Sequence, residues 1–264
     1  IVENKPGATG MLAGEAVAKG PADGSRFLVS FTAAIVGNKL LMDKMSFDPI
    51  DDLSPIGRIR IASNMLVVHP EIPVKNLKEF IAYVKSSRNE MNYASWGMGS
   101  GGHLAMESLL QQAGIRMNHV PYKSTASISQ DLIPGNIKIA WFDAATPLAQ
   151  IKAGKIRPIV CTGPNRLPQL PDVPTISESN YEYDAHPAYG LFGHKSLPPE
   201  IVAKVNQLLN RWLSLPETNA FFIEKQNLAP SEPTTPSEYA KILQNDMTAW
   251  TKLLNQAGMK KGQS

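Results

Sequence analysis

Cysteine is almost missing from this chain of 264 residues, which contains only Cys161. A single cysteine excludes an intrachain disulfide and any metal site built from several cysteines. Cys161 ends an apolar run that is typical of a buried strand, so we expect an inert thiol. The five histidines show no metal-ligand spacing, and we interpret His103 as a packing or capping residue. The sequence therefore predicts neither a metal site nor a bound cofactor.

Long apolar stretches and runs of basic residues are missing too. No stretch approaches the roughly 18–20 apolar residues that span a membrane, and the longest basic run is Lys260-Lys261. The formal net charge of +3 is only mildly basic and does not indicate nucleic acid as a partner. Hydrophobic residues make up 43% of the chain and charged residues 19%, which suits a globular protein of one large or two ordinary domains.

Most catalytic motifs are missing as well, including a zinc-protease helix, a P-loop lysine and a nucleophile elbow. One match is Gly97–Gly102, which has the G-x-G-x-x-G pattern of dinucleotide-binding sites. A Rossmann site also needs an acidic residue about 20 residues further on, but the next strand pattern runs from Met117 to Lys123 without a carboxylate. A Rossmann-like NAD(P)-binding enzyme using Gly97–Gly102 remains an alternative function, although we expect no catalytic residues.

The stretch from Asn92 to His103 predicts a strand, a glycine-rich turn and the start of a helix. The first backbone N–H groups of such a helix have no intrahelical partners, and they point out of the sheet edge where open α/β sheets bind ligands. The helix dipole adds positive potential there, so a small anion is the expected guest. The alternative is a tight turn that needs glycine and binds nothing.

Strand patterns alternate with helical patterns from Asn76 to Cys161. This alternation predicts the α/β class, with a parallel sheet covered by helices on both faces. After an irregular, proline-rich connection, three more helical patterns follow a strand at 188–193. They begin near Pro199, Pro216 and Pro236, where proline is tolerated in the first helical turn.

Eight short motifs follow one another along the chain: Glu3–Ala8, Pro21–Gly24, Leu66–Pro70, Asn92–Ser95, Gly97–Leu104, Val120–Lys123, Ile151–Lys155 and Leu170–Thr175. None is specific alone, but in this order they cover nearly the whole chain. Together they resemble the solute receptors of tripartite tricarboxylate transporters, also named Bug-type or TctC-like proteins. The family's opening strand and glycine-rich loop would precede Ile1, and the first three residues read as the end of a strand, so we expect a βα unit upstream.

The resemblance implies a periplasmic receptor with a type II periplasmic-binding-protein fold. Two Rossmann-like α/β domains would close around a small carboxylate, such as a di- or tricarboxylate, an amino acid or an aromatic acid. Strands 65–69 and 189–193 are the expected crossovers, so the expected domains are 1–69 with 190–264, and 70–189. The implied partners are the carboxylate and membrane transporter subunits, with the receptor a monomer. A metabolite sensor that serves a signalling partner remains a second alternative.

The resemblance also implies a ligand site built from both domains. Backbone N–H groups and hydroxyl groups of two helix N-termini would grip the carboxylate, beside a strand end and facing a loop of the other domain. The expected ligand-binding residues are Thr32, Ala33, Ser95, Trp96, Gly97, Gly99, Ser100, Gly101, Gly102, Tyr122, Lys123, Ser124, Thr125 and Asp143.

Three residues differ from the family pattern and bear on which ligand is bound. Ser124 stands where the family usually has glycine, Ala144 where it often has asparagine, and Trp96 is bulky for the loop. Two roles stay open. Asp143 either holds a ligand hydroxyl or amine, or caps the following helix, and Lys123 either attracts anions or is simply solvated.

Overall fold

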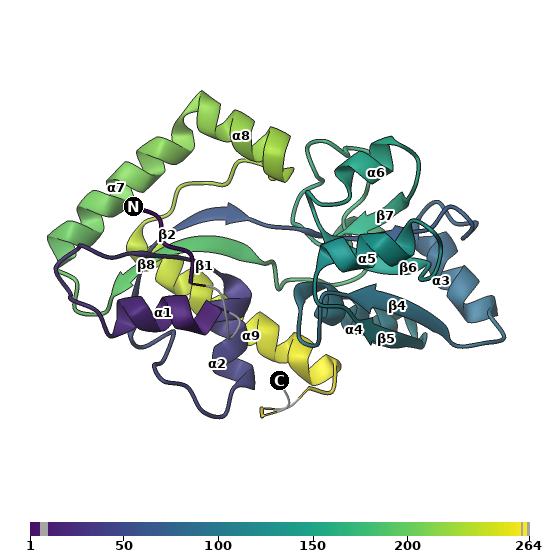
Figure 1. The fold of residues 1–264 in the computed structure, drawn as a ribbon, viewed down its shortest axis with the longest axis horizontal. Coiled ribbons are helices and arrows are strands. Elements are labelled where there is room, and N and C mark those ends of the chain that lie inside the picture. Colours follow the sequence, from purple (N-terminus) through teal and green to yellow (C-terminus); the bar gives the residue numbers. More distant parts are fainter. Residues whose placement is uncertain (6–9, 260, 263–264) are drawn as a thin grey trace.

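The computed structural model describes residues 1–5, 10–259 and 261–262 and shows two lobes, each built around its own β-sheet (Figure 1). The first motif of the sequence includes residues 6–9, which lie outside the described residues. Both lobes combine strands and helices, as the α/β expectation requires. No helix in the described part of the chain is long and apolar enough to cross a membrane.

The first lobe contains a three-stranded sheet in the order β1-β8-β2. Strand β8 lies in the middle and pairs antiparallel with both neighbours. The strands are β1 (Leu28–Phe31), β2 (Leu53–Ile61) and β8 (Ala188–His194), and the helical segments are α1 (Met11–Ala18), the π-helical turn η2 (Ala33–Gly37), α2 (Asn38–Leu41), α7 (Pro199–Ser214), α8 (Pro216–Gln226) and α9 (Pro236–Gln256).

The second lobe contains a five-stranded sheet in the order β5-β4-β6-β3-β7. Its strands are β3 (Asn64–Val68), β4 (Met91–Ser95), β5 (Met117–Pro121), β6 (Ile139–Asp143) and β7 (Arg157–Cys161), and its helical segments are α3 (Leu77–Ser86), α4 (Gly101–Ala113), α5 (Thr125–Leu132), α6 (Leu148–Lys152) and the 3-10 turn η3 (Ser177–Ser179). Strand β3 is buried at all five positions, which explains its unbroken apolar run Met65–Val68.

The strands of the alternating stretch run parallel, as the sequence predicts, but β3 runs antiparallel to its neighbours and makes the sheet mixed. Strand β4 pairs parallel with β5 and β6, but β3 pairs antiparallel with β6 and β7. The reason is that β3 does not arrive through a helical crossover. It continues directly from β2 after the two residues Ala62 and Ser63, and therefore enters the sheet from the other lobe.

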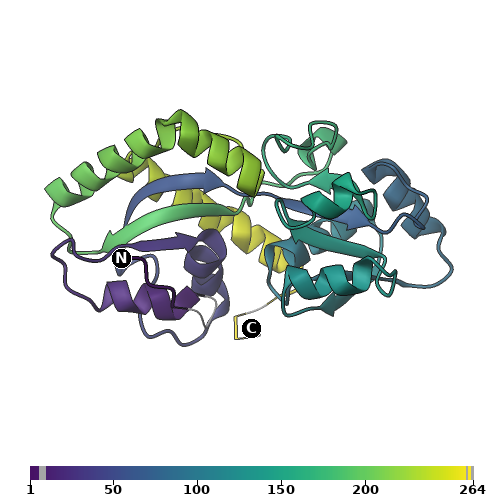
Figure 2. The same cartoon turned by 45° about the horizontal axis from the view of Figure 1, so that its top comes forward.

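Two segments carry the chain between the lobes, the β2–β3 junction and the residues before β8 (Figure 2). They are hydrogen-bonded to each other, since the Ala62 N–H donates to the Pro187 carbonyl at 2.7 Å. The expected boundary at residue 69 puts β3 in the first domain, whereas β3 hydrogen-bonds only within the five-stranded sheet. We therefore propose a division at 62–63 and near 187.

Helix α9 belongs to the first lobe but also contacts α4 of the second. Its residues Trp250, Leu253 and Leu254 are buried in one apolar cluster that also contains Leu104 and Met106. At the other end of the chain, Ile1 and Val2 are exposed and belong to no strand, so the reading of these residues as a strand end is wrong.

Candidate functional site

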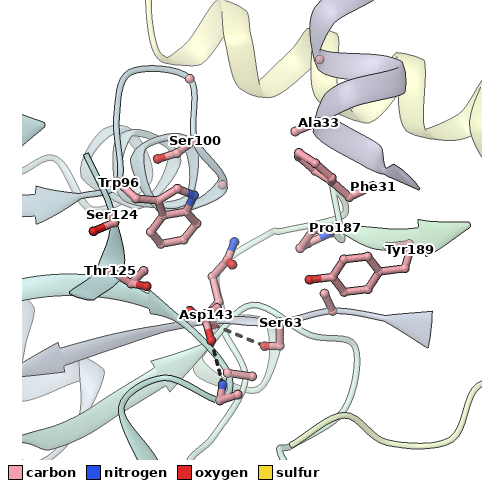
Figure 3. A pocket seen from close by; sticks show the side chains of 18 of the residues that line it. Phe31, Ala33, Ser63, Trp96, Ser100, Ser124, Thr125, Asp143, Pro187 and Tyr189 are labelled. Atoms are coloured by element: carbon pink, nitrogen blue, oxygen red, sulfur yellow. Dashed lines mark hydrogen bonds between the residues drawn. The ribbon is translucent and has the colours of Figure 1, made fainter. Parts of the chain in front are cut away.

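A cleft of about 660 Å³ lies between the lobes. Figure 3 shows Trp96, Ser100, Ser124 and Thr125 on one side, with Phe31, Ala33, Pro187 and Tyr189 opposite. Nine of the residues expected at the site line this cleft: Ala33, Trp96, Gly99, Ser100, Gly101, Lys123, Ser124, Thr125 and Asp143. The structure therefore brings together residues from β1–η2, β4–α4, β5–α5 and the end of β6.

The five other expected residues lie behind this surface. Thr32 is buried, and its hydroxyl accepts the Ala188 N–H at 2.9 Å and donates to the Ala188 carbonyl at 3.2 Å. The Tyr122 hydroxyl donates to Asp131. A side chain at Gly102 would clash with Trp141 and Trp96, so glycine lets α4 pack closely on the sheet. The remaining two are Ser95, which is fully buried, and Gly97.

The N-terminus of α4 brings backbone N–H donors to the cleft. Ser100 is the N-cap residue, and its Oγ accepts the His103 N–H at 3.3 Å. Its carbonyl accepts the Leu104 N–H, which leaves the N–H groups of Gly101 and Gly102 as the first-turn donors without an intrahelical acceptor. Helix α5 begins in the same way, with Ser124 Oγ accepting the Ser127 N–H. Two helix N-termini thus lie at one cleft.

A buried polar cluster holds the glycine-rich loop in place. His103 Nδ1 accepts the Gly99 N–H at 3.1 Å, while Ser95 Oγ contacts His119 Nε2 at 2.7 Å and Ser100 Oγ at 3.1 Å. The two imidazole rings stack with centroids 4.2 Å apart. Burial lowers the pKa of both histidines to about 4, helped at His103 by the charge of His119. Both rings are therefore neutral at physiological pH, and His103 accepts the Gly99 N–H of the loop.

Gly99 has a backbone φ of +69°. Residues with a Cβ rarely adopt this conformation, so the turn itself requires glycine here. A valine at this position would strain the turn whether or not an anion binds, and its effect would not separate the two readings of the loop. Gly101 is a better position for a substitution that tests anion binding, because its φ is not in that region.

Asp143 caps the turn that follows β6. Its Oδ1 accepts the N–H groups of Ala145 at 3.0 Å and Thr146 at 2.8 Å, and its Oδ2 accepts the Thr146 hydroxyl at 2.6 Å. Asp143 therefore caps this turn and not the following helix, because α6 begins at Leu148 with Pro147 as its N-cap and no side-chain cap. Asp143 also lines the cleft. Opposite, burial and the Asp143 charge raise the pKa of Tyr189.

Several residues that line the cleft were not predicted from the sequence. An aromatic wall is formed by Phe31, Tyr189 and Trp250, and Asn64 contributes a buried amide. Asn64 carried one usable signal, since it is a polar residue directly before the apolar run of β3. Within the described ranges no group of three or more His, Cys, Asp or Glu side chains is placed to hold a metal ion. Cys161 is buried, which raises its pKa to about 11.

A profile of the tripartite tricarboxylate transporter family receptor (TctC) matches residues 1–259. The chain belongs to this family. A Cupriavidus necator relative, the UPF0065 protein in the gbd 5'region, is 31% identical over 216 residues. This match covers 82% of the present chain and 65% of the relative, so the chain spans a little less than two thirds of that protein's length.

Solved structures agree with the family assignment. An R. palustris protein with adipate has a TM-score of 0.86 and 27% identity, covering 99% of this chain and 87% of that one. The periplasmic binding protein BugD has a TM-score of 0.80 and 26% identity, with the same two coverages. These similarities confirm the expected fold class, the α/β fold of periplasmic solute-binding proteins.

Proposed function

We propose that this protein is a periplasmic receptor that captures a small carboxylate in the cleft and delivers it to membrane transporter subunits. The observation that carries the proposal is the pair of helix N-termini, α4 and α5, at one cleft with an aromatic wall on the other lobe. Helix N-termini favour anions through free N–H groups and the helix dipole. The relative solved with adipate supports the same ligand class.

The chemistry of the lining favours recognition by backbone and amide groups. Lys123 is the single positively charged side chain among the described residues that line the cleft, and Asp143 is the single negatively charged one. The ligand carboxylate would therefore face N–H and O–H donors of the second lobe, while its carbon chain packs on the aromatic residues. Closure of the two lobes would remove both the carboxylate and the carbon chain of the ligand from water.

A thermal-shift panel on the full-length protein tests this function. The panel contains adipate, succinate, citrate, benzoate, glutamate and NADH, each at several concentrations. We expect a concentration-dependent rise in melting temperature with at least one of the acids, because a ligand that binds only the native state stabilises it. A rise with NADH and with none of the acids would contradict the proposal and favour the dinucleotide-binding alternative.

A further inference from the structure

Asn64 has a buried amide group without a partner. Its side chain lines the cleft, the residue is only 5% exposed, and Nδ2 makes no hydrogen bond among the described residues. An amide nitrogen that is buried without an acceptor loses its hydrogen bonds to water and destabilises the protein unless a ligand supplies one. Such an atom in a binding cleft therefore calls for a functional explanation.

The backbone of Asn64 is fixed on two sides. Its N–H donates to Thr162 Oγ1 at 2.9 Å, and its carbonyl accepts the Thr162 N–H at 2.9 Å. It also stands in register with Asp143 on the neighbouring strand β6. These contacts hold the start of β3, so the amide reaches the cleft from a rigid sheet edge.

The amide of Asn64 lies against the first residue of α4. A Cβ added at Gly101 would clash with Asn64 Nδ2, so the two residues are in close contact at the helix N-terminus. Nδ2 and the free N–H groups of Gly101 and Gly102 are all donors, and donors cannot satisfy one another. An acceptor from outside the chain has to complete this arrangement.

We infer that Asn64 Nδ2 and the first N–H groups of α4 together bind one carboxylate oxygen of the ligand, which makes Asn64 a specificity-determining residue of the cleft. The inference rests on the proposed function and adds a residue from β3 to the loops expected from the sequence. It also assigns a reason to Gly101, since a larger residue there would displace the Asn64 amide.

The test measures the affinity of the full-length protein for adipate, or for the strongest acid of the panel, by titration calorimetry. Asn64→Ala should weaken binding about tenfold or more, as expected for a lost hydrogen bond to a charged group. Asn64→Asp keeps the shape but places a negative charge beside the carboxylate, so its loss should exceed that of Asn64→Ala. Asn92→Ala, a matched change on β4 at an exposed position, should bind like the wild type.

Gly101→Ala gives a second, independent test of the same contact, because it displaces the Asn64 amide without removing it. It should reproduce the loss of Asn64→Ala, and the double variant should bind no worse than Asn64→Ala alone, since both changes act on one contact. Affinities of Asn64→Ala and Asn64→Asp within twofold of wild type would overturn the inference and leave the proposed function intact. If no acid binds the wild type, the proposed function fails and the inference fails with it.

Discussion

Lys123 is the positively charged side chain of the cleft, and it is exposed to solvent. Exposed charges interact weakly because water and salt screen them. We therefore expect Lys123→Ala to weaken carboxylate binding by no more than about 1 kcal/mol. Titration calorimetry at low and high salt measures this effect, and a loss above about 3 kcal/mol would show instead that an ion pair dominates.

Thr32 has a structural task that the family resemblance did not reveal. Its hydroxyl bridges the N–H and the carbonyl of Ala188 at the start of β8. Thr32→Val keeps the volume but leaves both buried groups unpaired, so the protein should lose about 1–3 kcal/mol of unfolding free energy. Urea unfolding checks this, with Thr125→Val, a change at the cleft surface, as the matched control. Equal stability of both variants would contradict the assigned role.

At the residue scale, the sequence predicts the loops that reach the site better than the full set of residues that line the cleft. Ser100 and Ser124 were expected at the site from the family resemblance, and the structure shows each as the N-cap of the following helix. Asn64 and Tyr189 were not found, because their place in the cleft depends on pairings of β3 and β8 with distant strands. Thr32 and Ser95 were placed at the correct loops, but whether a side chain faces the cleft or the interior depends on packing.

Among the elements, the loop between β4 and α4 depends on two neutral histidines. His119 contacts Tyr93 and Ser95 of β4. His103 Nε2 lies 3.9 Å from Glu107 on α4, which also accepts the Tyr93 hydroxyl. The pKa values of both histidines in the folded state, about 4, are below the ordinary 6.5. Between these values the unfolded chain binds more protons, so stability is present above pH 6.5 and falls as the pH drops toward 4.

Urea unfolding at pH 7.5, 6 and 5 should show this loss as a progressive fall in the unfolding free energy. His119→Gln removes one titrating group and should lose less stability over the same range. Asp246 has a pKa raised to about 6 by burial, so it acts with the opposite sign in both proteins and cancels in the comparison. Parallel curves for the two proteins would show that His119 is not the source.

The elements themselves were largely predictable where a local period defines them. Helices α7, α8 and α9 begin at Pro199, Pro216 and Pro236, where the sequence predicts them to begin. Strand β3 was also expected, but its antiparallel position between β6 and β7 was not. The apolar run of Met65–Val68 shows that a strand is buried and says nothing about its neighbours, which come from β6 and β7 far along the chain.

At the scale of the whole molecule, the cleft is bounded by two lobes that are joined by the β2–β3 junction and the residues before β8. Such paired connections form hinges in binding proteins. We expect a saturating acid ligand to reduce the radius of gyration measured by small-angle X-ray scattering. The contact of α9 with α4 limits how far the lobes can separate. An unchanged radius with bound ligand would contradict closure.

The central claim is that a small carboxylate binds between the lobes, and filling the cleft tests it most directly. Ala33 lines the cleft from the first lobe, opposite Trp96 and Ser100 (Figure 3), so Ala33→Trp fills ligand space while leaving the residues of the α4 N-terminus unchanged. By titration calorimetry the wild-type protein should bind its strongest acid with micromolar affinity, on the order of −8 kcal/mol. The Ala33→Trp variant should show no binding while its melting temperature without ligand stays near that of the wild type. Equal affinity of both proteins would contradict the placement of the ligand in this cleft.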